Sequence, residues 1–263
     1  MDSTPSRMEF AVQMTCQSCV NSIKNSLSGI EGIHEVDINL PQEQVVITTV
    51  LPSAEVKEIL ESTGRKAVFK GQGSNITGKH LGAAVCMIET GDPVRGVVRL
   101  LQVAEDNCIV EGTIDGLSPG NHSLRIHEYG DISDGCSSCG NVFDARGFLH
   151  GQSASSEKLT GDLGVITAES NGRSLFRMEN SRVKVWDIIG RSLVVGDLPD
   201  ATSQISAKFG VGIACGIIAR SAGLFENTKK ICACDGVTLW DERNVPVAGK
   251  ARSEFMKAKA SAL

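Results

Sequence analysis

The chain has 263 residues, of which 41% are apolar and 22% are charged, the composition of an ordinary globular protein. This length suits two domains with an appended segment better than one small module. A net charge of −5, with no block of Lys or Arg, excludes the basic surface that binds nucleic acids or anionic membranes. The sequence also lacks a run of about 18 apolar residues that could span a membrane.

The N-terminus lacks the apolar run of a signal peptide, and we therefore expect a cytoplasmic protein. A secondary pool in the mitochondrial intermembrane space or the nucleus is compatible with the sequence. In a reducing compartment, nine Cys do not predict a disulfide framework, and close Cys pairs indicate metal or redox chemistry. The last three residues, 261–263, resemble a peroxisomal Ser-Lys-Leu signal only weakly, and we do not expect a peroxisomal protein.

The first 70 residues alternate between strand and helix patterns. Strands are expected where apolar and polar residues alternate, and helices where apolar residues recur at helical spacing. The predicted elements, in chain order, are a half-buried strand at 8–14, a helix at 20–30, strands at 36–40 and 45–51, a helix with Ser53 as N-cap, and a strand at 66–70. The order βαββαβ is that of the ferredoxin-like fold.

The pattern of apolar and polar residues changes after residue 80 and divides the chain into two parts. Short apolar runs separated by turn residues, such as 95–102 and 107–114, predict a β-sandwich or barrel rather than helices. The expected organisation is α+β and multidomain: a βαββαβ domain at 1–71, a Gly- and Ser-rich linker at 72–80, a β-domain at 81–222, and a polar, largely irregular tail at 223–263.

Cys16 and Cys19 are separated by two residues on the loop between the first predicted strand and helix. Backbone N–H groups and the dipole at a helix N-terminus lower the pKa of a thiol, so thiolate is available near neutral pH. Soft thiolates select Cu(I), zinc or an iron–sulfur cluster, and a closed zinc site needs four ligands that this unit does not offer. Two thiolates suffice for low-coordinate Cu(I), and Lys66 could offset the charge of the complex. The pattern therefore predicts a Cu(I) site.

Two other interpretations of this pair stay open, a thioredoxin-like redox couple and two structural Cys. Spacing alone separates them weakly, although a thioredoxin unit is larger and carries a cis-Pro strand. The run Met14-Thr-Cys16-Gln-Ser-Cys19 resembles the Met-x-Cys-x-x-Cys motif of the heavy-metal-associated domain, which implies copper binding. We interpret Met14 as a packing residue beneath the loop and not as a ligand.

The second unit carries an ordered series of short motifs from about residue 82 to 222. They are Gly120-Asn-His122-Ser-Leu-Arg125-Ile-His127-Glu-Tyr-Gly130-Asp131, Gly135-Cys136, His150-Gly151, Gly161-Asp162-Leu163-Gly164, Ile189 to Val195, and Ala214-Cys215-Gly216. The series resembles Cu/Zn superoxide dismutase and implies a Greek-key β-sandwich.

The same resemblance argues against dismutase activity. It places the four copper-ligand positions at Arg125, His127, Val142 and Gly196, and the four zinc-ligand positions at Val142, His150, Leu159 and Asp162. One copper ligand and two zinc ligands remain, so His127, His150 and Asp162 form only a vestigial site, where zinc is doubtful. The Arg that guides superoxide in the family is replaced by Gly212.

Structural features of the family are retained. The resemblance implies a disulfide between Cys136 and Cys215, with a reduced pair of thiols as the alternative in the cytosol. It also implies a dimer contact whose retained positions are Gly130, Ile189, Gly190, Arg191, Ile217 and Arg220. A domain that loses its catalyst and keeps its dimer face looks like a docking module for the active dismutase.

The polar tail contains a third pair, Cys232 and Cys234, flanked by Lys229-Lys230. A disulfide between residues i and i+2 is strained, so this pair should be an oxidising, labile couple. As thiolates the two Cys could instead hold Cu(I), and the neighbouring lysines favour thiolate. A Cys-x-Cys pair in a tail is weak evidence when it stands alone.

The three parts in this order resemble the family of copper chaperones for superoxide dismutase. The resemblance implies that Cys16 and Cys19 acquire Cu(I) and that the second domain forms a heterodimer with immature Cu/Zn superoxide dismutase. Cys232 and Cys234 would then transfer copper and exchange disulfides with the client. The same face is compatible with a homodimer. The alternatives are a thiol–disulfide oxidoreductase for the same client and a superoxide dismutase.

Overall fold

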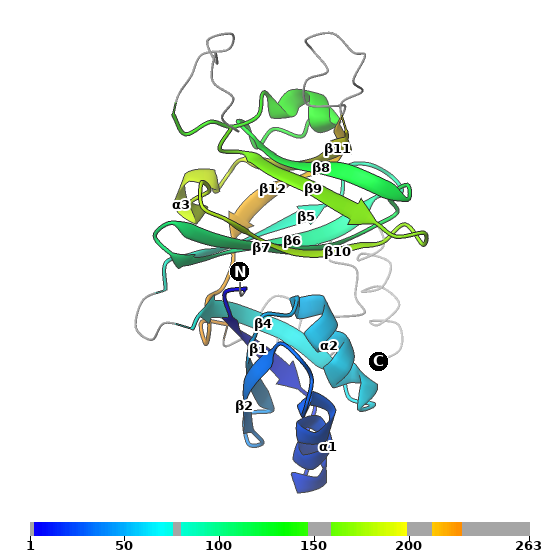
Figure 1. Cartoon of the computed structure of the whole chain (residues 1–263), viewed down its shortest axis with the longest axis vertical. Helices are drawn as coiled ribbons and strands as arrows, with labels where there is room; N and C mark the ends of the chain where they lie inside the picture. The colour runs from blue at the N-terminus through cyan, green and yellow to red at the C-terminus, as the bar shows by residue number, and fades with distance from the viewer. Residues whose placement is uncertain (1–2, 76–79, 147–158, 199–211, 228–263) are drawn as a thin grey trace, which may run out of the picture.

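The computed structural model describes residues 3–75, 80–146, 159–198 and 212–227, which form two packed units (Figure 1). The first comprises β1 (Ser6–Val12), α1 (Gln17–Leu27), β2 (Ile33–Asn39), β3 (Gln44–Thr49), α2 (Ser53–Ser62) and β4 (Ala67–Ser74). Its strands form one antiparallel sheet in the order β2-β3-β1-β4, which confirms the predicted ferredoxin-like fold.

The second unit is an eight-stranded antiparallel sheet. Its elements are β5 (Ala83–Ile88), β6 (Arg95–Ala104), β7 (Asn107–Asp115), β8 (Gly120–His127), the 3₁₀ helix η1 (Gly135–Cys139), β9 (Asp162–Ala168), β10 (Ser174–Asn180), α3 (Val185–Ile188), β11 (Ser192–Asp197) and β12 (Gly212–Arg220). The strand order in the sheet is β10-β7-β6-β5-β12-β11-β8-β9. Strands β7 and β8 follow each other in the chain but are not adjacent in the sheet, and the same holds for β10 and β11, as in Greek-key connections. The end strands β9 and β10 contact each other, so the sheet closes into a flattened barrel, as predicted.

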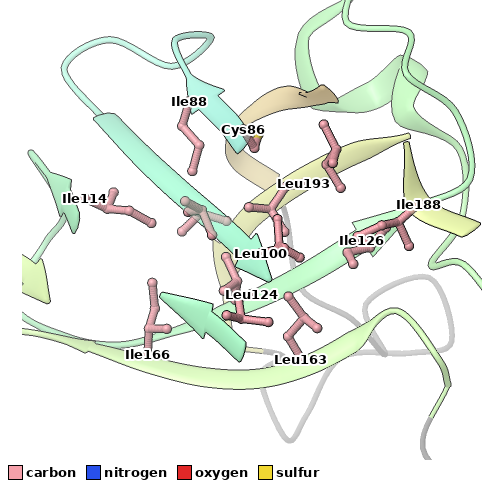
Figure 2. Packing of buried hydrophobic residues seen from close by; sticks show 14 of the residues in the cluster. Cys86, Ile88, Leu100, Ile114, Leu124, Ile126, Leu163, Ile166, Ile188 and Leu193 are labelled. Carbon is pink, nitrogen blue, oxygen red and sulfur yellow. The ribbon is translucent and has the colours of Figure 1, made fainter. Parts of the chain in front are cut away.

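Each unit has its own apolar core. In the first, α1 and α2 pack their apolar faces on one side of the sheet, around Phe10, Ile23 and Leu60. In the second, inward-facing residues of the barrel strands meet, and Figure 2 shows them converging from opposite walls: Cys86, Ile88, Leu100, Ile114, Leu124, Ile126, Leu163, Ile166, Ile188 and Leu193. No helix in the described ranges is long and apolar enough to cross a membrane.

The two units contact each other through α2 and β4 on one side and β6 and β7 on the other (Figure 1). The backbone N–H of Ser53 donates to Oε2 of buried Glu111 at 3.3 Å, and the Arg99 guanidinium lies 4.5 Å from the centre of the Phe69 ring. The predicted N-cap is thereby corrected. Ser53 is the first helical residue and Pro52 is the N-cap, so the Glu111 carboxylate supplies the acceptor that a capping side chain would otherwise provide.

Two expectations about segment ends differ from the structure. β4 continues to Ser74, because 71–74 pair with β1, so the first three residues of the predicted linker are strand. Gly223, the predicted start of an irregular tail, forms a parallel bridge with Gln72, and the N–H of Phe225 donates to Glu9 Oε2 at 2.8 Å. Residues 223–226 therefore cover the polar face of β1, which explains why the strand predicted as half-buried is buried on both faces.

Candidate copper-binding site and docking domain

The predicted copper site lies where β1 ends and α1 begins. Cys16 is the N-cap of α1 and Cys19 is its third residue, so both thiols sit at the positive end of an 11-residue helix whose first turn contains no acidic residue. Their Sγ atoms are 3.5 Å apart. Cys16 is exposed and Cys19 is buried, so a partner molecule reaches the pair from the Cys16 side.

Local hydrogen bonds favour thiolate at this site. The backbone N–H of Thr15, the side chain of Arg65 and the backbone of Cys16 stabilise the charged sulfur and lower the pKa of Cys19 from 9.0 to about 6. The pKa of Cys16 is also lowered, chiefly by a hydrogen bond with the Ser18 hydroxyl at 3.0 Å. At pH 7 Cys19 is therefore mostly thiolate, the form that binds soft metals and attacks disulfides.

The spacing of the two sulfurs suits a shared ion. A metal–thiolate bond of about 2.3 Å lets one ion bridge two sulfurs that are at most about 4.6 Å apart. From 3.5 Å, the sulfurs need to separate by no more than about 1 Å to give a linear two-coordinate site. Rotation of the exposed Cys16 side chain can provide that movement.

Residues missed in the sequence hold the loop and tune its charge. Arg65, and not the predicted Lys66, contributes the cation beside Cys19, and its Nη1 donates to the Thr63 carbonyl at 2.8 Å. Glu43, in a left-handed conformation with φ of 51°, accepts the N–H of Met14 at 3.2 Å through its side chain. Met14 itself is 3% exposed within the core, which confirms that it packs beneath the loop.

The vestigial dismutase site holds an ion pair. Arg125 on β8 is buried, and its Nε lies 3.9 Å from Oδ1 of Asp162 on β9. His127 donates from Nδ1 to the Gly140 carbonyl at 2.8 Å, and burial lowers its pKa, which favours the neutral ring. The guanidinium therefore places a fixed positive charge beside the carboxylate that would otherwise bind a cation.

The described residues do not fit zinc. Val142 and Leu159 offer no donor atom at two of the family's ligand positions, and Asp162 already pairs with Arg125. Among the residues placed in the structure, no three His, Cys, Asp or Glu are arranged to hold a metal ion. His150, the remaining member of the vestigial set, lies outside the described residues, as do Cys232 and Cys234.

The retained dimer-contact positions gather on one surface at the turn between α3 and β11 and on β12. A side chain at Gly130 would strike the Gly190 carbonyl and lie 3.5 Å from Ile217, so these three residues are direct neighbours. Ile217 is 41% exposed although it is apolar, and Trp186 on α3 is 46% exposed. Arg191 directly follows Gly190 in the chain, and its guanidinium stacks 3.8 Å from the centre of the Phe143 ring.

The remaining members of this set are Ile189 and Arg220. Ile189 packs partly into the barrel core, and Arg220 is exposed at the end of β12. Both line a cavity of about 330 Å³ together with Trp186. The surface formed by Gly130, Gly190 and Ile217 is therefore apolar at Ile217, with bare backbone at the two glycines. We call it the docking face.

The predicted disulfide pair is in contact but unbonded. Cys136 on η1 and Cys215 on β12 are free thiols that are hydrogen bonded to each other. A side chain at Gly212 would come within 3.1 Å of the Cys136 sulfur, so only a glycine lets η1 approach β12 this closely. The disulfide between Cys136 and Cys215 stays a prediction.

Comparison with known proteins agrees with both units. Residues 9–66 match the heavy-metal-associated domain, and residues 94–218 match copper/zinc superoxide dismutase (SODC). The chain is 50% identical over 260 residues to the copper chaperone for superoxide dismutase of Homo sapiens, covering 96% of this chain and 94% of that protein. The chain belongs to the family of copper chaperones for superoxide dismutase.

More distant members span plants and yeasts. The copper chaperone for superoxide dismutase, chloroplastic/cytosolic, of Arabidopsis thaliana is 39% identical over 236 residues, which cover 90% of this chain and 70% of that protein. The superoxide dismutase 1 copper chaperone of Debaryomyces hansenii is 35% identical over 254 residues, 93% of this chain and 97% of that protein. The chain is therefore a metallochaperone, as its sequence predicted.

Proposed function

We propose that this chaperone binds Cu(I) through Cys16 and Cys19 and docks on immature Cu/Zn superoxide dismutase. It then inserts copper and promotes formation of the client's intramolecular disulfide. The observation that carries the proposal is the pair of adjacent thiols with a Cys19 pKa of about 6, joined to a dismutase-like domain whose metal site holds an Arg125–Asp162 ion pair. The first unit offers two adjacent thiols to the metal, and the dismutase-like unit has an ion pair where the family binds metal.

Copper moves by ligand exchange. The two thiolates leave Cu(I) coordinatively unsaturated, so a thiolate of the recipient can bind before a donor sulfur leaves. Because Cys16 is exposed and Cys19 is buried, we expect the Cys16–copper bond to be the first to break. A proton returns to the released sulfur, so copper transfer is coupled to the protonation of the donor thiols.

The client's disulfide forms by thiol–disulfide exchange at the tail. A Cys232–Cys234 disulfide would accept two electrons from the client's dithiol through a mixed disulfide and return as a dithiol. An external oxidant must then restore the tail disulfide. The tether between the docked domain and the tail raises the effective concentration of these thiols at the client to about the millimolar range.

Docking uses the face around Gly130, Gly190 and Ile217. An apolar side chain that is 41% exposed beside two bare backbone segments suits a two-fold contact with a related barrel. We expect the client's own dimer face to be that barrel, giving a heterodimer, and a homodimer of the chaperone would compete for the same surface. We assign this reaction to the cytoplasm, with no zinc in the dismutase-like domain.

The decisive experiment mixes the purified chain with metal-poor, reduced dismutase and Cu(I), and follows the client's disulfide and activity. Activation should be lost when Cys232 and Cys234 are both changed to Ser, and copper stoichiometry should fall when Cys16 and Cys19 are changed. Cys108→Ser, a buried cysteine in β7, is the matched control and should leave both unchanged. Failure of the intact chain to activate the client would overturn the proposal, and activation that resists a copper chelator would favour a thiol oxidoreductase.

A separate arm tests docking. Ile217→Asp places a charge on the docking face and should abolish heterodimer formation measured by analytical ultracentrifugation. Val165→Asp, on β9 and 51% exposed, introduces the same charge at another apolar surface position and should not affect binding. Equal loss in both variants would show that the effect is not specific to this face.

A further inference from the structure

Three thiols, and not two, meet where η1 packs on β12. Cys136 and Cys139 are separated by two serines on η1, and Cys215 lies on β12. The side chain of Cys215 is hydrogen bonded to those of both Cys136 and Cys139. Cys139 and Cys215 are completely buried beside Val194, whereas Cys136 is partly exposed.

We propose that Cys136, Cys139 and Cys215 form an intramolecular disulfide-exchange site, in which Cys215 bonds to either of the other two cysteines. This site goes beyond the proposed function, which uses only Cys16, Cys19 and the tail pair. Its substrates are disulfides and thiols rather than a metal, because the three residues are not among any metal-binding groups in the described ranges.

The exchange conserves electrons. Starting from a Cys136–Cys215 disulfide, the deprotonated sulfur of Cys139 attacks the sulfur of Cys215. The Cys139–Cys215 bond forms as the Cys136–Cys215 bond breaks, and Cys136 leaves with the electron pair as a thiolate. A small-molecule disulfide such as oxidised glutathione supplies the first bond and leaves as two thiols.

The surroundings of the three thiols set the direction in which exchange is easy. Cys136 is partly exposed whereas Cys139 is buried, so water can solvate the departing Cys136 thiolate and Cys136 is the better leaving group. Burial raises the pKa of Cys139 to about 11, so its attacking thiolate is scarce at neutral pH and exchange is slow. Thr90 holds Cys215 in place, with its Oγ1 2.8 Å from the sulfur and 3.0 Å from the backbone nitrogen.

The exchange changes which thiol solvent can reach. With Cys136 bonded to Cys215, the free thiol is the buried Cys139. After exchange, the free thiol is Cys136, which is partly exposed and lies six residues after Gly130 of the docking face. The domain would thus present or withdraw a reactive thiolate on the loop that follows the docking face, without any change in its oxidation state.

Disulfide mapping on the full chain tests this site. The protein is equilibrated in a glutathione redox buffer, quenched in acid and alkylated, and its disulfides are assigned by mass spectrometry. Fragment spectra are required, because Cys136 and Cys139 lie on one peptide. We expect both Cys136–Cys215 and Cys139–Cys215 in the native chain.

Single variants separate the two bonds. In Cys136→Ser the Cys139–Cys215 disulfide should persist, and in Cys139→Ser only Cys136–Cys215 should form. Cys108→Ser is the control for a buried cysteine elsewhere and should leave both pairings unchanged. A Cys136→Ser chain whose Cys139 and Cys215 are both alkylated would overturn the proposal, as would a native chain that contains Cys136–Cys215 alone.

Discussion

Replacing Arg65 by Met tests how the predicted copper site keeps Cys19 as a thiolate. The guanidinium is one of the causes that lower the pKa of Cys19 to about 6, second to the N–H of Thr15. An opposite charge at this range lowers a pKa by about 1 to 3 units. Because the site is open to solvent on the Cys16 side, we expect the lower end, and Arg65→Met should raise the pKa of Cys19 by about 1 unit.

The loss of Cys19 thiolate in Arg65→Met should be largest at acidic pH. The thiolate is populated above its pKa and is lost as pH falls through it, so a rise of one unit cuts the thiolate fraction at pH 5 by about tenfold. At pH 8 both chains are mainly thiolate and should react almost equally. Apparent Cu(I) affinity should fall in the same pH range, because protons compete with copper for the sulfur.

The assay measures the alkylation rate of Cys19 from pH 4.5 to 9 in a Cys16→Ser background, with the modified peptide identified by mass spectrometry. Lys66→Met is the matched control, since this neighbouring exposed cation is not among the groups that shift Cys19. Lys66→Met should leave the midpoint of alkylation near that of the Cys16→Ser parent. An unchanged midpoint in Arg65→Met, or a larger shift in Lys66→Met, would refute the assignment.

Three further predictions concern stability and metal content. Glu111→Gln should lower the free energy of unfolding by about 1–3 kcal/mol in urea titrations, because the buried carboxyl group accepts the Ser53 N–H and lies near the half-buried Arg99 and Arg177; the exposed Glu58→Gln should cost less than about 1 kcal/mol. Arg125→Met should cost about 1–3 kcal/mol, because it leaves the carboxylate of Asp162 without its cation. Zinc added to the native chain should not raise its melting temperature, and a rise that is reversed by a chelator would contradict our account of the vestigial site.

The first unit was predictable because its signals are local. Alternation and helical spacing in a short segment identify strands and helices, and the two Cys at a strand–helix junction predict a metal site there. The position of Arg65 was not predictable, because two neighbouring cations alternate in direction on a loop and only the folded backbone decides which one faces the sulfur. Glu43 was missed for a related reason: its role depends on a left-handed backbone conformation that its residue type does not favour.

Features that depend on contacts between the units were beyond the sequence pattern. Glu111 lies in the middle of an apolar strand, and nothing near it in the chain indicates that it accepts the first N–H of α2. The strand pairing of 71–74 and the bridge at Gly223 likewise depend on the two units lying side by side. Cys139 was passed over because family resemblance singles out Cys136 and Cys215, and only the packing of η1 on β12 adds the third thiol.

The ion pair of Arg125 and Asp162 explains how a dismutase-like domain can serve in a chaperone. An intact set of copper or zinc ligands would compete with the client for metal, and removing ligands alone would leave a carboxylate that lacks its counter-charge. The Arg125 guanidinium has both effects that are needed: it neutralises the Asp162 carboxylate, and its permanent positive charge repels a metal cation. The barrel can thereby keep its fold without a metal at the vestigial site, and copper that the chaperone delivers would meet a fixed positive charge there instead of a ligand set.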